Sequence, residues 1–228
     1  MKFLRVLSLL FFYSLSVTAQ DNHPDTRLAM QNVKELGVGG SWIPAKPANT
    51  YIKGSQYLFN SWAGRYTVVS KKGVISQTLN LNYNIMSKKL ESYIAKDSVF
   101  QYDLEQFDYI EKYNSKYKVF KNNQLEGLFQ ELFSNGKIAF YKEVIVSVQE
   151  GTINPLTQEL IGENEYVKKN IYFINSKEKF EKIKLNKKDI LKSLLDKEEL
   201  IKTYVKENML TYSSEEDVIK ILTYYNTI

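Results

Sequence analysis

The chain has 228 residues, of which 43% are hydrophobic, so it is long enough to bury a single core. It contains no cysteine and one histidine, His23, which excludes a disulfide framework, cysteine-ligated zinc and a thiol nucleophile and argues against a Ser-His-Asp triad. The formal net charge of +5 is small for this length and does not indicate a nucleic-acid-binding protein.

Residues 1–19 have the three parts of a secretory signal peptide. Lys2 and Arg5 form a positive n-region, Val6–Leu15 is a short apolar stretch, and the small residues Val17 and Ala19 suit cleavage after position 19. No cysteine follows the apolar stretch, so we expect no lipid at the new N-terminus. No later stretch is long and apolar enough to predict a transmembrane segment. The sequence therefore predicts an exported protein.

Residues 20–53 predict an irregular leader that wraps onto the domain. Glycine and proline recur in this stretch, and only Thr26–Leu36 suggests a short helix. His23 lies here among polar residues, and we expect it to be exposed and not to bind a metal.

Residues 54–185 predict an antiparallel β-sheet. In Leu79–Ile85 apolar residues alternate with asparagine, which predicts a strand with one buried and one wet face. Lys71–Gly73 indicates a hairpin turn, and Asn135-Gly136 before Ile138–Gln149 is the strongest hairpin signal in the chain. Short strands with tight turns favour a β-meander, because parallel strands need helical crossovers that the sequence lacks. The meander could be curved or rolled into a half-barrel.

Residues 186–228 predict two or three short amphipathic helices packed on the same domain. Three pairs have the spacing of a helix cap and its N3 residue: Asn186 with Asp189, Asp196 with Glu199, and Ser213 with Glu216. Apolar stripes at helical spacing could also bind a partner or a membrane surface, but acidic and basic residues are nearly balanced on the polar faces, which favours internal packing. The predicted fold class is α+β.

Few residues indicate enzymatic chemistry. A glycosidase needs only two suitably spaced carboxylates, but nothing in the sequence selects a pair from the candidates Asp97, Asp103, Glu105, Asp108, Glu111, Glu131 and Glu143. The aspartates lack the spacing of a calcium loop, and no glycine-rich phosphate loop is present. We therefore expect no metal or other cofactor. A binding protein is a better expectation than an enzyme.

Aromatic residues gather near the start of the predicted sheet. Tyrosine and tryptophan form binding platforms for sugars and hot spots for protein partners. The candidate ligand- or partner-binding residues are Trp42, Tyr51, Tyr57 and Trp62. The same side chains could instead build the core and its lid.

Three segments resemble an uncharacterised family of exported proteins in Bacteroidota: Gly54–Trp62, the Leu79–Ile85 strand, and Ser214–Asp217 with Tyr224–Asn226. The shared motifs are aromatic and capping residues, so the resemblance implies no activity. It implies a Gram-negative periplasm or an association with the outer membrane. The helical ending is unlike the β-rich sorting domain of that phylum's type IX cargo, so we expect release to the outside less.

Three functions follow as hypotheses. The first is a non-enzymatic binding or accessory module for another envelope protein. The second is a periplasmic carrier that holds an apolar or glycan ligand in a curved sheet. The third is a hydrolase that uses paired carboxylates. A carrier needs a void among inward-facing apolar side chains, whereas an accessory module fills its core and exposes a binding surface. The oligomeric state is left open.

Overall fold

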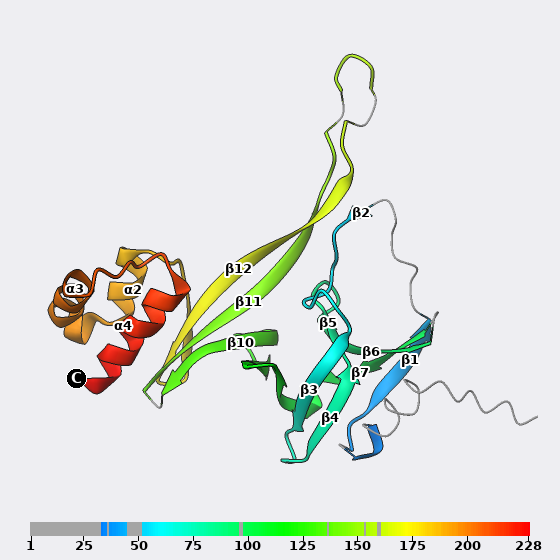
Figure 1. Ribbon diagram of the computed structural model, residues 1–228, viewed down its shortest axis with the longest axis horizontal. Helices are drawn as coiled ribbons and strands as arrows, with labels where there is room; N and C mark the ends of the chain where they lie inside the picture. Colours follow the sequence, from blue (N-terminus) through cyan, green and yellow to red (C-terminus); the bar gives the residue numbers. More distant parts are fainter. Residues whose placement is uncertain are drawn as a thin grey trace, which may run out of the picture.

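The computed structural model describes residues 33–35, 37–44, 52–95, 98–135, 137–152, 154–158 and 161–228 (Figure 1). The predicted signal peptide, His23 and Tyr51 lie outside these residues. Within them the fold is α+β, with antiparallel sheets followed by helices, which confirms the predicted class. None of the described helices is long and apolar enough to cross a bilayer.

Nine strands form the larger sheet. In spatial order, eight of them are β13 (Lys179–Ile183), β12 (Asn164–Ser176), β11 (Ile138–Gln149), β10 (Glu126–Asn135), β9 (Ser115–Lys121), β8 (Phe107–Lys112), β3 (Ala63–Ser70) and β4 (Ile75–Asn80). The ninth, β2 (Ile52–Lys53), makes a short parallel pair with β12, although the sequence predicts antiparallel pairing alone. From β8 to β13 successive strands are neighbours, which is the predicted meander, and the predicted hairpins β3–β4 and β10–β11 are confirmed.

A second, four-stranded sheet is not predicted by the sequence pattern. Its order is β1 (Gly40–Pro44), β7 (Ser98–Tyr102), β6 (Lys89–Ala95) and β5 (Asn82–Asn84). A 3-10 turn, η1 (Leu104–Gln106), leads from β7 back to the larger sheet. The predicted Leu79–Ile85 strand is divided between the two sheets, because β4 ends at Asn80 in the larger sheet and β5 begins at Asn82 in the smaller one.

The expectation that the asparagines of this run face water is wrong. Asn82 is 1% exposed, and its side-chain amide accepts from the Phe59 N–H at 3.0 Å and donates to the Phe59 carbonyl at 2.9 Å. A buried amide can satisfy backbone groups where no strand is available to do so. Asn82 therefore ties the irregular segment 54–62 to the sheet.

Three helices end the chain: α2 (Lys187–Ser193), α3 (Glu198–Glu207) and α4 (Glu215–Thr227), with a 3-10 turn, η2 (Leu195–Lys197), before α3. The Asn186 cap is confirmed, since its side chain accepts from the Asp189 N–H at 2.9 Å. The cap of α4 is Ser214, one residue later than predicted. The predicted Asp196 cap is wrong, because α3 has no side-chain cap and Asp196 accepts from the Tyr225 hydroxyl instead.

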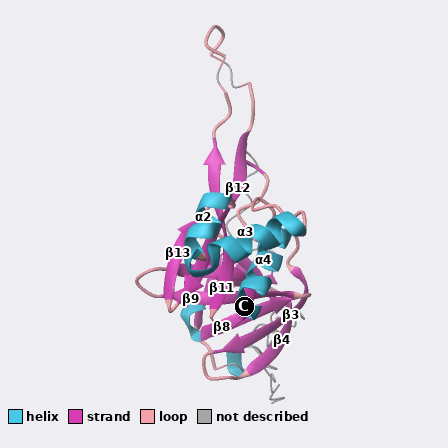
Figure 2. Cartoon of the chain, turned by 90° about the vertical axis from the view of Figure 1, so that its left-hand side faces the viewer, coloured by secondary structure: helices cyan, strands magenta, loops and turns pink. Residues whose placement is uncertain are grey.

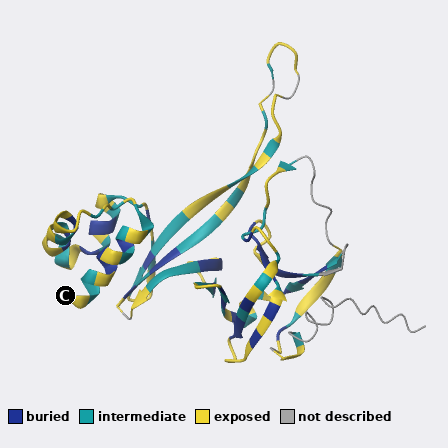
Figure 3. Ribbon diagram, in the orientation of Figure 1, coloured by how far each residue is buried: buried dark blue, intermediate teal, exposed yellow. Residues whose placement is uncertain are grey.

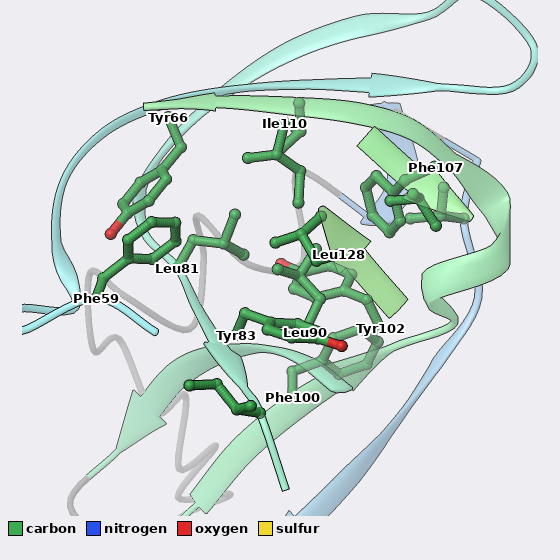
Figure 4. Close-up of a cluster of buried hydrophobic side chains, with 14 residues drawn as sticks. Phe59, Tyr66, Leu81, Tyr83, Leu90, Phe100, Tyr102, Phe107, Ile110 and Leu128 are labelled. Carbon is green, nitrogen blue, oxygen red and sulfur yellow. The ribbon is translucent and has the colours of Figure 1, made fainter. Parts of the chain in front are cut away.

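The first hydrophobic core lies between the two sheets (Figure 4). Its most buried side chains include Tyr66, Phe107 and Ile110 from the larger sheet and Leu90 from the smaller one. Lys112 enters this core from β8, with its Nζ 2.7 Å from the Tyr66 hydroxyl oxygen, and burial lowers the pKa of its ammonium.

A second core packs the helices against the larger sheet. It joins Phe140 and Ile174, on β11 and β12, to Ile201 and Ile221, on α3 and α4. Strand β11 also contributes to the first core through Val144 and Val146, so the same strand links both.

Aromatic rings fill the concave side of the curved sheet between β9 and β13. The rings of Phe120 and Phe180 are 5.0 Å apart, although three strands separate β9 from β13, and Phe129 and Tyr141 are buried between them. The sheet does not close, because β13 and β4 are its two ends.

Substitution of Asn82 by alanine tests the role of its buried amide. We expect Asn82→Ala to lower the free energy of unfolding by about 1–3 kcal/mol, because both backbone groups of Phe59 lose their partner. Urea unfolding measures this loss, with the exposed Asn60→Ala as the control. Equal stability of the two variants would contradict the assigned role.

Candidate functional site

Strands β11 and β12 form a long two-stranded arm (Figure 2). They pair along the whole of β11, whereas β10 pairs with β11 only from Ile138 to Lys142. Beyond Gln130, toward its own start, β10 leaves β11 and continues to pair with β9 alone. In the described part of the chain no strand covers this side of Glu143–Gln149, which we call the open edge.

The open edge lacks the features that usually prevent unwanted strand pairing, such as lysine, proline or short length. Other edges of the described sheets have them: β13 carries three charged residues, β1 ends at Pro44, and β5 has three residues. The remaining end strand, β4, is mostly polar. The open edge instead contains the uncharged run Val144–Val148, four of whose five residues are valine or isoleucine.

A groove of about 240 Å³ lies beside the open edge. Its lining includes Glu143–Val146, Met86, Lys88 and the buried Tyr83 and Leu128. Sites for drug-sized ligands usually measure roughly 300–1,000 Å³. The groove therefore suits the side chains of one extended segment better than such a ligand.

Two side chains hold the start of β10 away from β11. The Lys88 Nζ donates to the Glu126 carbonyl at 3.0 Å, and the Tyr83 hydroxyl bonds the Leu128 backbone. Gly127 makes this approach possible: its φ is +130°, and a Cβ at this position would lie 2.8 Å from the Tyr83 hydroxyl oxygen. Beyond the last β10–β11 pair, the start of β10 thus contacts Tyr83 and Lys88 instead of β11.

Glu143 is the acidic group of the groove. It is half-buried, and in the described residues its carboxylate makes no hydrogen bond or ion pair. Burial raises the pKa of this carboxyl, while the nearby positive charges of Lys88 and Lys182 act in the opposite direction. The groove therefore contains one partly desolvated acidic group, Glu143, and one ammonium, Lys88.

Two of the predicted aromatic residues, Tyr57 and Trp62, come together. Their ring centroids are 4.8 Å apart at 59°, and Trp62 meets Tyr93 edge to face. The Tyr57 hydroxyl donates at 2.9 Å to Glu91, which is 2% exposed and also accepts from Gln101 at 2.7 Å. The rings are tilted and pack against one another, so they offer no flat stacking platform. Their contacts instead fix the segment 54–62 to the small sheet.

Trp42 lies on the other face of the small sheet. It is 47% exposed and packs edge-on against Phe100, its partner in the β1–β7 register. Trp62 contacts Tyr93, whose partner is Val99, and successive strand residues point to opposite faces. The structure therefore does not join Trp42 to the Tyr57–Trp62 pair, and Tyr51 lies outside the described residues.

Most of the candidate carboxylates gain no catalytic context. Glu105 pairs with Lys121 at 3.2 Å, while Glu131 pairs with Lys116 and accepts from the Tyr141 hydroxyl. Asp97 lies outside the described residues, within which no group of three acidic or histidine side chains could hold a metal. Glu143 differs from these residues because it lines a groove.

A larger hollow, of about 500 Å³, lies on the surface of the helical region. Its lining includes three lysines, Lys187, Lys202 and Lys206, and the apolar Val205 and Leu210. Lys202 is already held by Glu198 and Glu199, at 2.6 and 2.8 Å. No backbone edge opens here, so we place the candidate site at the open edge of β11.

Sequence reasoning included Glu143 among many carboxylates but missed Lys88 and the open edge. One signal was present: Val144–Val146 is apolar at three successive positions, which places apolar side chains on both faces of the strand. Such a run is typical of a strand covered on both sides. The divergence of β10 carries no comparable signal, because it depends on contacts with the distant Tyr83 and Lys88.

Comparisons with known proteins return no match: no protein-family model, no curated protein and no solved structure is similar to this chain.

The raised pKa of Glu143 predicts a pH dependence of stability. A carboxyl with a higher pKa in the folded state binds its proton more tightly there, so the free energy of unfolding should fall as the pH rises above the group's ordinary value of 4.5. Glu143→Gln should remove part of this fall, whereas the exposed Glu150→Gln should not. Urea unfolding across this pH range measures both, and parallel curves for the two variants would contradict the assignment.

Proposed function

We propose that this protein is a non-enzymatic exported envelope protein that binds another envelope protein by accepting an extended segment of it as an additional strand on β11. The single observation that carries the proposal is the unprotected open edge, Glu143–Gln149, with a groove beside it.

Backbone chemistry supports strand addition. An edge strand presents unpaired N–H and C=O groups, and an added strand satisfies them while its alternate side chains enter pockets. A two-stranded ribbon is only marginally stable in water by itself. A third strand on the open edge would extend the sheet and cover the run Val144–Val148.

The arm is held in place before any partner binds. The Lys168 Nζ donates to the Tyr57 carbonyl, and β2 pairs with Asn164 and Glu165 near the far end of β12. Val144 and Val146 pack against the first core. Fixing the acceptor strand in advance lowers the entropy that binding must remove, so this anchoring favours a binding role over that of a free tail.

The alternatives receive less support. The aromatic rings of Phe120, Phe129 and Tyr141 fill the concave side of the sheet, where a carrier would need space for its ligand. A hydrolase needs two carboxylates facing one cleft, and Glu143 is the one carboxylate among the described residues that line the groove.

A charge placed on the open edge tests strand addition. The probe is a bead library of seven-residue peptides, the length of Glu143–Gln149, attached through either terminus. We expect binders whose affinity falls about tenfold or more with Ile145→Lys, because a lysine on the edge opposes pairing. Ile145 is 37% exposed, so the substitution should leave the fold intact. Fluorescence anisotropy of the selected peptides measures the affinity.

The matched control is Ile75→Lys, which makes the same change at an exposed position of the end strand β4. This variant should bind within about twofold of the unchanged protein, since an exposed surface substitution far from the groove has little effect. A library without binders, or equal losses in both variants, would overturn the proposal.

A further inference from the structure

A strand added to the open edge would cover the carboxylate of Glu143. Glu143 is the first residue of β11 beyond its last pair with β10, Gln130–Lys142, so it lies where the two strands separate. Its side chain lines the groove and is half-buried. Figure 3 shows the buried residues near the start of β10 beside the partly exposed strands of the arm. A strand on the open edge therefore removes further water from this carboxylate.

Within the described residues this carboxylate has no partner that would compensate for the lost water. The two nearby ammonium groups there, Lys88 and Lys182, form no ion pair with it. Lys88 instead donates to the Glu126 carbonyl at 3.0 Å. A carboxylate that is buried without a charged or hydrogen-bonding partner is costly. A segment that supplies a partner for Glu143 should therefore bind more tightly than one that does not.

The pleat of β11 determines where that partner lies on the added strand. Successive side chains point to opposite faces, so Glu143 shares a face with Ile145. Val144 and Val146 share the other face and pack against the first core. A residue that pairs with Glu143 or with Ile145 directs its side chain to the face of Glu143, within reach of a long side chain. Lysine and arginine have this length, and their hydrogen bonds to a carboxylate are stronger than neutral ones.

We infer that the segment which pairs with the open edge carries a lysine or arginine beside Glu143 and apolar side chains along Val144–Val148. This inference rests on the proposed function and names its substrate class: an extended segment that is basic at one end and apolar along the rest. The basic residue lies at the end nearest the β10–β11 pairs. That end is the C-terminal one in an antiparallel strand and the N-terminal one in a parallel strand.

The tightest binder from the bead library is the probe, with both ends blocked so that no terminal charge takes part. We expect it to carry a lysine or arginine near one end. An uncharged analogue, with norleucine in place of lysine or citrulline in place of arginine, should bind the unchanged protein about tenfold more weakly, because it cannot form the charged contact. Fluorescence anisotropy with the full chain measures both affinities.

Substitutions of Glu143 locate the contact. On Glu143→Gln the charged peptide and its uncharged analogue should bind alike. On Glu143→Lys the charged peptide should bind more weakly than a third peptide with glutamate at the same position, because the two charges are exchanged. Glu150→Gln is the control, since Glu150 is exposed, follows the open edge and does not line the groove. This variant should keep the full preference for the charged peptide.

Ile145→Lys separates this inference from the proposed function, because it should weaken the uncharged analogue as well, which a new positive charge does not repel. A tightest binder without lysine or arginine, or a preference for the charged peptide that Glu143→Gln leaves unchanged, would overturn the inference about charge. If Ile145→Lys still weakened binding in that case, strand addition itself would stand. Binding that is insensitive to Ile145→Lys would overturn both.

Discussion

The separation of β10 from β11 is the constraint on which the rest of the site depends. A strand edge in water must be paired, covered or protected by charge, because its backbone groups otherwise recruit other chains. Here Tyr83 and Lys88 bond the start of β10, which continues along β9 and leaves Glu143–Gln149 exposed on one side. The open edge therefore results from contacts made by residues at the first core, and not from a flexible loop.

The two hydrophobic cores make this edge rigid. Strand β11 belongs to both, through Phe140 in the helical core and Val144 and Val146 against the core between the sheets. The Lys168–Tyr57 hydrogen bond and β2 fix the distal part of the arm. A binding strand that is already ordered loses little entropy when a partner pairs with it. The same architecture thus stabilises the fold and, in the function proposed above, orders the acceptor strand before a partner binds.

Local patterns predict the α+β class, the meander from β8 to β13, the β10–β11 hairpin and the Asn186 cap, because each depends on neighbouring residues. They do not predict the second sheet. The alternating pattern of Leu79–Ile85 indicates one strand with its asparagines in water, whereas Asn82 is buried and its side chain bonds the backbone of the distant Phe59. Of the candidate aromatic residues, Tyr57 meets Trp62, but Trp42 lies on the opposite face of the small sheet, and their binding role stays a prediction. The groove depends on contacts between distant strands, which no local pattern contains.

Amide hydrogen exchange of residues 138–149 tests the central claim most directly. In an antiparallel pair successive N–H groups point to alternate sides, so the open edge should show alternating slow and fast exchange, while 138–142, bonded on both sides, should be uniformly slow. Addition of a groove-binding peptide should make 143–149 uniformly slow. Uniform protection of 143–149 in the free protein, or exchange unchanged by a bound peptide, would contradict the account.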